Sequence, residues 1–223
     1  MSTERNSLRA TFDEAALRYE EVRPGYPEEL FNDVVSLSGI PAGGRIPEIG
    51  CGTGQATVPF ARRGYRILCV ELGENLSAVA CRTLEAYPQA EVYIGPFEQW
   101  HLQAPARRGL RSGRIGHRLP LAQPRGAYPK DASELKGGGS LALFWKVHVH
   151  TNADRGFFEE AQRIYKREAS EIVRPDDYKG LARPDEVPSR TPEIEGSGLF
   201  EVSTSRQYRW DETYDTAGYL ARA

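Results

Sequence analysis

Residues 45–54 read RIPEIGCGTG, and this stretch decides the fold. We predict a short strand over 45–49, a tight turn at the glycines, and a helix that runs to Arg63 and ends at Gly64. A strand, a glycine-rich turn and a helix in this order form the first crossover of a doubly wound sheet. Ligands of such sheets bind beyond the carboxyl ends of the strands. The stretch therefore predicts both the fold and the place of a binding site.

The rest of the chain alternates between helical and strand patterns. We expect helices over 11–22, 27–37, 74–87 and 154–168, and strands over 65–72, 90–95, 141–147 and 200–210. Strands that alternate with helices predict an α/β fold: a Rossmann-like, doubly wound, mostly parallel sheet with helices on both faces.

The composition bounds the class of protein. The chain has 223 residues, 39% hydrophobic and 27% charged, which suits one globular domain with a small appendage. No run approaches the ~20 apolar residues of a membrane span, and the charged start lacks the apolar core of a secretory signal. Three cysteines without a ligand-like spacing predict neither a disulfide framework nor a metal site. We therefore expect a cytoplasmic protein without a membrane partner.

The spacing of the glycine loop separates three classes of ligand. A P-loop carries Lys and Ser or Thr after its last glycine, whereas Gln55 and Ala56 follow Gly54. A dinucleotide fingerprint carries glycine at the position of Gln55, which disfavours a nicotinamide dehydrogenase. Instead, Glu48 lies two residues before the first glycine. Glu71 closes the next strand, 21 residues after that glycine, where an acidic side chain is placed to bind ribose hydroxyls.

This E-x-G-x-G-x-G arrangement resembles motif I of the class I S-adenosylmethionine (SAM)-dependent methyltransferases. Other stretches resemble further parts of the small-molecule subgroup of that family. They are FDEAALRYEEVRPGYPEEL (12–30), its N-terminal lid; GPFEQW (95–100), the turn along the adenine; LKGGGSLALFW (135–145), the turn into the fifth strand; and residues 198–220, its C-terminal segment.

The resemblance implies a SAM-dependent methyltransferase that methylates a small-molecule acceptor by in-line displacement, with no metal. By the same resemblance, Glu48 and the loop residues Gly50, Cys51, Gly52, Thr53 and Gly54 hold the methionine part of SAM. Glu71 holds the ribose with Leu72 beside it, Phe97 lines the adenine, and Tyr19, Arg23 and Tyr26 close over the cofactor. No catalytic side chain is assigned, because alignment of the acceptor supplies most of the catalysis.

Several features depart from the family pattern. Pro47 lies inside the first strand, where a proline removes a ladder hydrogen bond. Gly137 stands where the family has proline, and the chain ends at Ala223, before the helix and strand that usually follow. The fourth strand is missing between Trp100 and Leu135. In its place, residues 101–130 carry six arginines and one lysine but no acidic residue, with no helical or strand period.

A pair of compensating frameshifts explains the missing strand. Codons exist for residues 108–127 that, when they are read one base later, encode GAFDLVASATAFHWLNPEA. That peptide contains the F-D-L-V strand and the F-H-W turn of the family, in order and in place. We therefore hypothesise that residues 106–127 are a frameshifted segment and that their arginines are accidental.

These observations predict three parts of the chain: an N-terminal helical lid (1–40), a SAM-binding core (41–146) that includes the aberrant segment, and a C-terminal helix and strand (147–223). The alternative function is an impaired or inactive methyltransferase remnant that at most binds SAM. A nucleic-acid-binding protein that uses the basic segment is disfavoured, because the frameshift explains those arginines.

Overall fold

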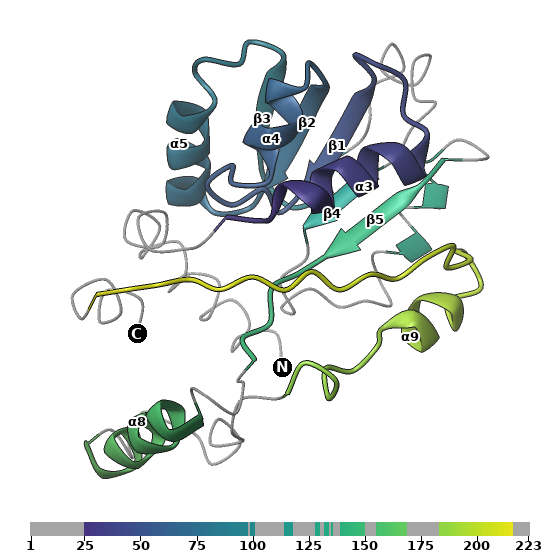
Figure 1. Cartoon of the computed structure of the whole chain (residues 1–223). Coiled ribbons are helices and arrows are strands. Elements are labelled where there is room, and N and C mark those ends of the chain that lie inside the picture. Colours follow the sequence, from purple (N-terminus) through teal and green to yellow (C-terminus); the bar gives the residue numbers. More distant parts are fainter. Residues whose placement is uncertain are drawn as a thin grey trace. The chain divides into compact units, whose positions relative to one another are not determined.

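A computed structural model gives the fold of the chain (Figure 1). It describes residues 25–97, 99–100, 114–117, 128–129, 132–133, 135, 139–149, 155–168 and 183–215. The chain divides into two compact units. One consists of Met1–Phe144 together with Glu193–Ala223, and the other is Trp145–Pro192.

The first unit is built on a parallel sheet of five strands. They are β1 (Arg45–Ile49), β2 (Arg66–Glu71), β3 (Ala90–Ile94), β4 (Arg114–His117) and β5 (Leu141–Phe144). Their order across the sheet is β3-β2-β1-β4-β5, and every neighbouring pair is parallel. The order reverses between β1 and β4, which is the switch point of a doubly wound sheet. The predicted Rossmann-like α/β fold is thus confirmed.

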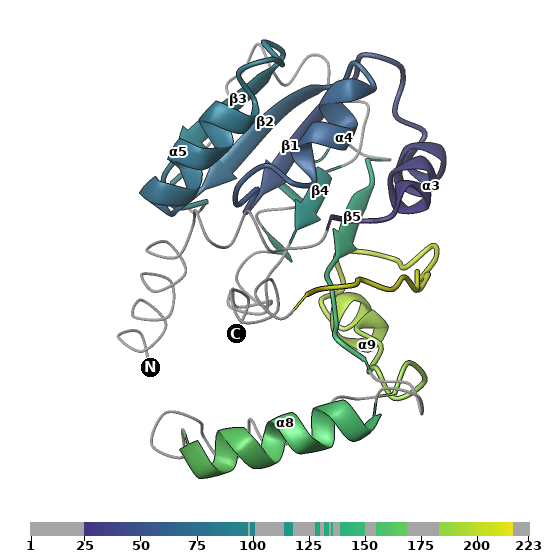
Figure 2. The same cartoon turned by 60° about the vertical axis from the view of Figure 1, so that its left-hand side comes forward.

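Three helices lie over one face of this sheet (Figure 2). They are α3 (Glu28–Ser38), α4 (Thr57–Arg62) and α5 (Glu74–Thr83). Gly39 ends α3 with φ 61°, a conformation that a side chain disfavours. The predicted helix over 74–87 ends earlier, because its last residues form a turn in which the Tyr87 N–H donates to the Leu84 carbonyl at 2.8 Å.

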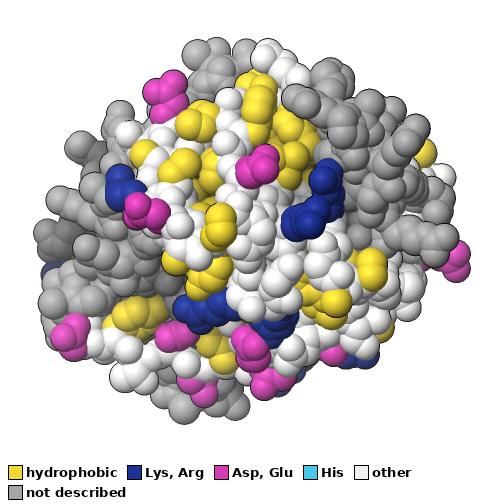
Figure 3. All heavy atoms as spheres, turned by 90° about the horizontal axis from the view of Figure 1, so that it is seen from above, with side chains coloured by type: hydrophobic (Ala, Val, Ile, Leu, Met, Phe, Trp, Pro, Cys, Tyr) yellow, Lys and Arg dark blue, Asp and Glu magenta, His cyan; other side chains and the backbone are white. Residues whose placement is uncertain are grey.

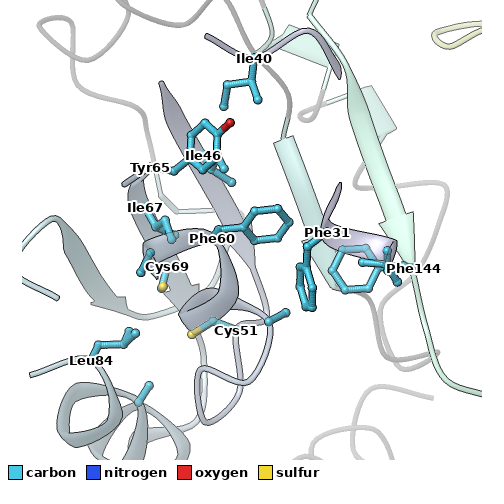
Figure 4. Packing of buried hydrophobic residues seen from close by; sticks show 14 residues of the cluster. Phe31, Ile40, Ile46, Cys51, Phe60, Tyr65, Ile67, Cys69, Leu84 and Phe144 are labelled. Atoms are coloured by element: carbon cyan, nitrogen blue, oxygen red, sulfur yellow. The ribbon is translucent and has the colours of Figure 1, made fainter. Parts of the chain in front are cut away.

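Aromatic side chains fill the space between helices and sheet (Figure 4). Phe60 on α4 is fully buried and meets Phe31 on α3 edge to face, with ring centroids 5.0 Å apart. Arg63 fastens the same two helices: its guanidinium donates to the Asn32 side chain at 2.9 Å, pairs with Glu28 and lies over the Phe31 ring. This packing fixes α4, and with it the loop that leads into α4.

The structure corrects two predictions about strands. Residues 114–117 form β4, although the local pattern predicts no strand there; the ladder with β1 and β5 forms it despite a weak local preference. The predicted strand over 200–210 does not form, because its backbone has no ladder partner among the described residues. That segment is held by side chains instead, since the Tyr208 hydroxyl donates to Asp33 on α3 at 2.5 Å.

The predicted helix over 11–22 lies outside the described residues. The second unit contains α8 (Arg155–Glu168), as predicted, and the short helix α9 (Thr191–Glu195) begins at its end. Within the described part of the chain, no helix has the length and apolar character that crossing a bilayer demands.

Candidate functional site

The glycine loop follows the carboxyl end of β1 and is hydrogen-bonded to the neighbouring strand β2. The Gly50 N–H donates to the Val70 carbonyl of β2 at 2.7 Å, and the Gly54 N–H donates back to the Cys51 carbonyl at 3.0 Å. Gly52 and Gly54 have φ of 59° and 92°, a region that other residues rarely adopt. A Cβ built on Gly52 meets no atom within 4 Å, so this part of the loop leaves room for a ligand to approach the backbone.

Glu71 at the end of β2 holds the loop in place. Its Oε2 accepts the Gly52 N–H at 2.8 Å, and its Oε1 accepts the N–H groups of Leu72 and Gly73 at 2.9 and 3.0 Å. The predicted ribose-binding carboxylate thus joins the glycine loop to the turn that follows β2. Three N–H donors leave part of its acceptor capacity for further hydroxyl groups, because two carboxylate oxygens offer about four lone-pair positions.

Glu48 lies beneath the same loop and is fully buried. Neither of its carboxylate oxygens has a hydrogen-bond partner in the structure. Burial raises the pKa of Glu48 to about 8; the nearby Thr57 hydroxyl opposes this rise and the negative charge of Glu71 adds to it. A buried carboxyl of this kind is expected to be neutral at pH 7.

Apolar groups border the loop on the side of β3. Leu72 follows β2 and is 42% exposed, and Ile94 ends the adjacent strand β3 and is 51% exposed. The turn after β3 is tied to β2, because the Gly95 N–H donates to the Glu71 carbonyl at 2.8 Å. Phe97 stacks on Trp100, with ring centroids 6.1 Å apart. The structure therefore gives Phe97 a packing partner next to the predicted adenine region.

The predicted lid residues are placed only in part. Tyr26 packs edge to face against Phe144 at the end of β5 and against Phe31, with ring centroids 5.1 and 6.3 Å apart. Tyr19 and Arg23 lie outside the described residues.

The remaining loop residues do not form a nucleophilic or metal site. Thr53 and Cys51 are buried, and contact with the Cys69 thiol, followed by burial, raises the pKa of Cys51 well above its ordinary value of 9.0. A thiol of this kind is a poor nucleophile. Among the described residues, no group of three His, Cys, Asp or Glu side chains is arranged to hold a metal ion.

Other surfaces of the described chain offer less chemistry. An apolar recess lies near the amino ends of β1 and β5, away from the glycine loop, and its wall includes Ile40, Ile46 and Ala142. On the face shown in Figure 3, acidic and basic side chains are interspersed with apolar ones, and no patch of one charge dominates.

Two buried polar residues, one of them near Glu48, were not predicted. Thr57 begins α4, and its hydroxyl lies 3.7 Å from the Cys69 sulfur; Ser77 on α5 is buried with no partner for its hydroxyl. The only signal in the sequence was the position of Thr57, three residues after the last glycine of the loop.

Known proteins resemble this chain in sequence over most of its length. A protein of Mycobacterium tuberculosis named an uncharacterized methyltransferase is 26% identical over 174 residues, or 77% of this chain and 65% of that protein. A SAM-dependent Diels-Alderase, iliD of Neonectria sp., is 23% identical over 69% of this chain and 62% of that protein. No protein-family profile matches.

The chain is thus similar in sequence to a protein that is named a methyltransferase. It spans less than two thirds of the length of the relatives named above. Among solved structures, the CcbJ methyltransferase of Streptomyces caelestis is 19% identical and covers 56% of this chain and 53% of its own, with a TM-score of 0.46. The glycopeptide N-methyltransferase MtfA, solved with SAM, is 19% identical over 54% of each chain, with a TM-score of 0.42.

Proposed function

We propose that the chain binds SAM at the carboxyl ends of β1, β2 and β3. The observation that carries this proposal is the joint placement of Glu71 and the glycine loop, linked by the bond from the Gly52 N–H to Oε2. A carboxylate of this kind suits two ribose hydroxyls. The open space at Gly52 and the unpartnered oxygens of Glu48 suit the polar methionine part of the ligand.

The residues present therefore fit the cofactor. Glu71 and Leu72 are expected to bind the ribose, and Phe97 and Ile94 to border the adenine. Glu48 and the loop backbone are expected to bind the amino-acid end. When bound, SAM supplies an activated methyl group on a sulfonium, so the protein needs to align an acceptor rather than to form a covalent intermediate.

We further propose that the acceptor is a small molecule in the reducing interior of the cell. On the face shown in Figure 3, the described residues carry charges of both signs, which supports a small acceptor rather than nucleic acid. The similar protein iliD is named a SAM-dependent Diels-Alderase, which is another reaction, so cofactor binding and methyl transfer need separate tests. A remnant that binds SAM without transfer is the alternative; Pro47 lies within the central strand, where it costs stability, but the relatives named above do not favour this alternative.

Calorimetric titration with SAM tests the binding step. We expect micromolar binding that Glu71→Ala abolishes and Glu91→Ala, on exposed β3, leaves unchanged. Incubation with methyl-labelled SAM and pools of small metabolites then tests transfer. Labelled product together with S-adenosylhomocysteine identifies a methyltransferase, whereas binding without turnover identifies the remnant. No binding by the unaltered chain would refute both.

A further inference from the structure

Two glycines of the loop have different surroundings. A Cβ built on Gly52 meets no atom within 4 Å, whereas a Cβ built on Gly54 lies 3.6 Å from Thr83 Cγ2 and 3.7 and 3.8 Å from Leu84 Cγ and Cδ2. The last three distances are ordinary van der Waals contacts. Gly52 therefore faces open space, and Gly54 faces an apolar wall at the C-terminal end of α5.

The wall is a fixed part of the core. Leu84 is 4% exposed and belongs to the buried cluster of Figure 4. Its N–H donates to the Ala80 carbonyl at 2.9 Å, and its carbonyl accepts the Tyr87 N–H at 2.8 Å. The Thr83 hydroxyl donates to the Val79 carbonyl at 3.0 Å, so the Thr83 methyl group is the part of this side chain that lies nearest Gly54.

Gly54 joins the loop to α4. Its N–H donates to the Cys51 carbonyl within the loop, and its carbonyl accepts the Val58 N–H of the first turn of α4, both at 3.0 Å. Protein interiors are close-packed and transmit displacements. A shift of Gly54 toward α5 therefore moves the loop and the start of α4 together.

The start of α5 is linked to the same loop. Glu71 accepts the N–H of Gly73, which caps α5, and also the N–H of Gly52. The helix is thus connected to the loop by a polar link at its start and by apolar side chains at its end. The polar link acts at Gly52, and the apolar wall acts at Gly54.

We propose that Leu84 is a positioning residue of the cofactor site: its side chain supports the glycine loop at Gly54 and keeps the loop backbone where the amino-acid end of SAM binds. The inference rests on the proposed binding of SAM. Leu84 acts through Gly54 and does not touch the ligand. Loss of the Leu84 side chain leaves a cavity behind Gly54 into which the loop can relax. Binding groups must be held within about 0.5 Å of their productive place, so this relaxation lowers the affinity.

Titration calorimetry of the full chain with two ligands tests the proposal. The ligands are SAM and 5′-methylthioadenosine, which keeps the adenosine and the sulfur but lacks the amino-acid end. We expect Leu84→Ala to weaken SAM binding about tenfold and 5′-methylthioadenosine binding by less than about twofold. Val79→Ala is the matched control, because Val79 lies on the same helix and is 2% exposed. It should change neither affinity by more than about twofold.

Two milder variants separate positioning from stability. Leu84→Met conserves the volume of the side chain and should keep the affinity for SAM within about twofold of the unaltered protein. Thr83→Ser removes the methyl group nearest Gly54 and keeps the hydroxyl that bonds to Val79. It should weaken SAM binding about twofold to threefold, in the same direction as Leu84→Ala. A purely structural role would weaken both ligands by the same factor, because unfolding removes both binding regions.

Hydrogen exchange of the cofactor-free protein makes the test independent of ligand. Amide groups exchange faster where the local structure opens more readily. We expect faster exchange over residues 50–58 in Leu84→Ala and unchanged exchange there in Val79→Ala.

The outcomes are distinct. Faster loop exchange in Leu84→Ala, together with a loss of affinity for SAM that exceeds the loss for 5′-methylthioadenosine, supports the inference. Unchanged loop exchange in Leu84→Ala, or equal losses for the two ligands, overturns the inference alone. No SAM binding by the unaltered protein overturns the proposed function and this inference together.

Discussion

Glu71→Gln isolates the contribution of one carboxylate to the shape of the candidate site. The carboxylate accepts three backbone N–H groups and is only 9% exposed. A glutamine offers one accepting oxygen, so it keeps the two bonds from Leu72 and Gly73 at neutral strength and turns an N–H₂ group toward the Gly52 N–H. Hydrogen bonds to charged groups contribute about 1.5–3 kcal/mol each, and neutral ones about half of that.

The lost bond and the two weakened bonds together predict a loss of about 3–6 kcal/mol in the free energy of unfolding. Urea denaturation followed by tryptophan fluorescence, without cofactor, measures this change. Glu91→Gln on exposed β3 serves as the control and should change the free energy by less than about 0.5 kcal/mol. A loss below about 0.5 kcal/mol for Glu71→Gln as well would refute the reasoning, because it would mean that Glu71 does not hold the loop.

Four further predictions follow from other parts of the chain. Pro47→Val restores an N–H next to the point where the ladder with β4 begins, and should raise the free energy of unfolding by about 0.5–1 kcal/mol in urea titrations. Phe60→Ala leaves a cavity in the fully buried centre of the core and should lower the free energy of unfolding by about 3–5 kcal/mol. A change under about 1 kcal/mol would contradict the packing described. The Tyr208 hydroxyl, followed by the Arg206 guanidinium, lowers the pKa of Asp33 below 3.8. The ionised Asp33 carboxylate therefore stabilises the folded state above pH 3.8, and this stabilisation is lost as the pH falls through the folded pKa. Asp33→Asn should flatten acid unfolding curves in that range. Sequencing of the gene tests the frameshift hypothesis, which fails if the codons for 108–127 do not encode the family motif one base later.

The fold was predictable because its signal is local. The glycines of GCGTG need a turn, and the pattern on each side of them specifies a strand and a helix, so the crossover follows from ten residues. The strand at 114–117 could not be predicted, since its own sequence has no period and its partners on both sides form it. The reverse holds for 200–210, where an alternating pattern finds no strand to pair with.

The positions of Glu48 and Glu71 in the fold could be predicted from the sequence, but the states of their side chains could not. Spacing placed Glu48 and Glu71 at one sheet edge, and the structure has both beside the loop. Spacing could not show that Glu71 accepts three backbone donors whereas Glu48 has no partner. Hydrogen bonding depends on which atoms the folded chain brings within about 3 Å of each other. The sequence does not show that side chains such as Thr57 and Ser77 are buried or which atoms they meet.

The hydrogen bonds from Gly50 and Gly95 to β2 have a consequence for protein engineering. Both neighbouring strands end by donating to carbonyls at the end of β2, at Val70 and Glu71. This strand is therefore the common reference against which the two adjoining turns are positioned, and any shift of β2 displaces both at once. Efforts to give this scaffold a new substrate should leave β2 unchanged and vary the chain beyond β5, where no such double attachment is described.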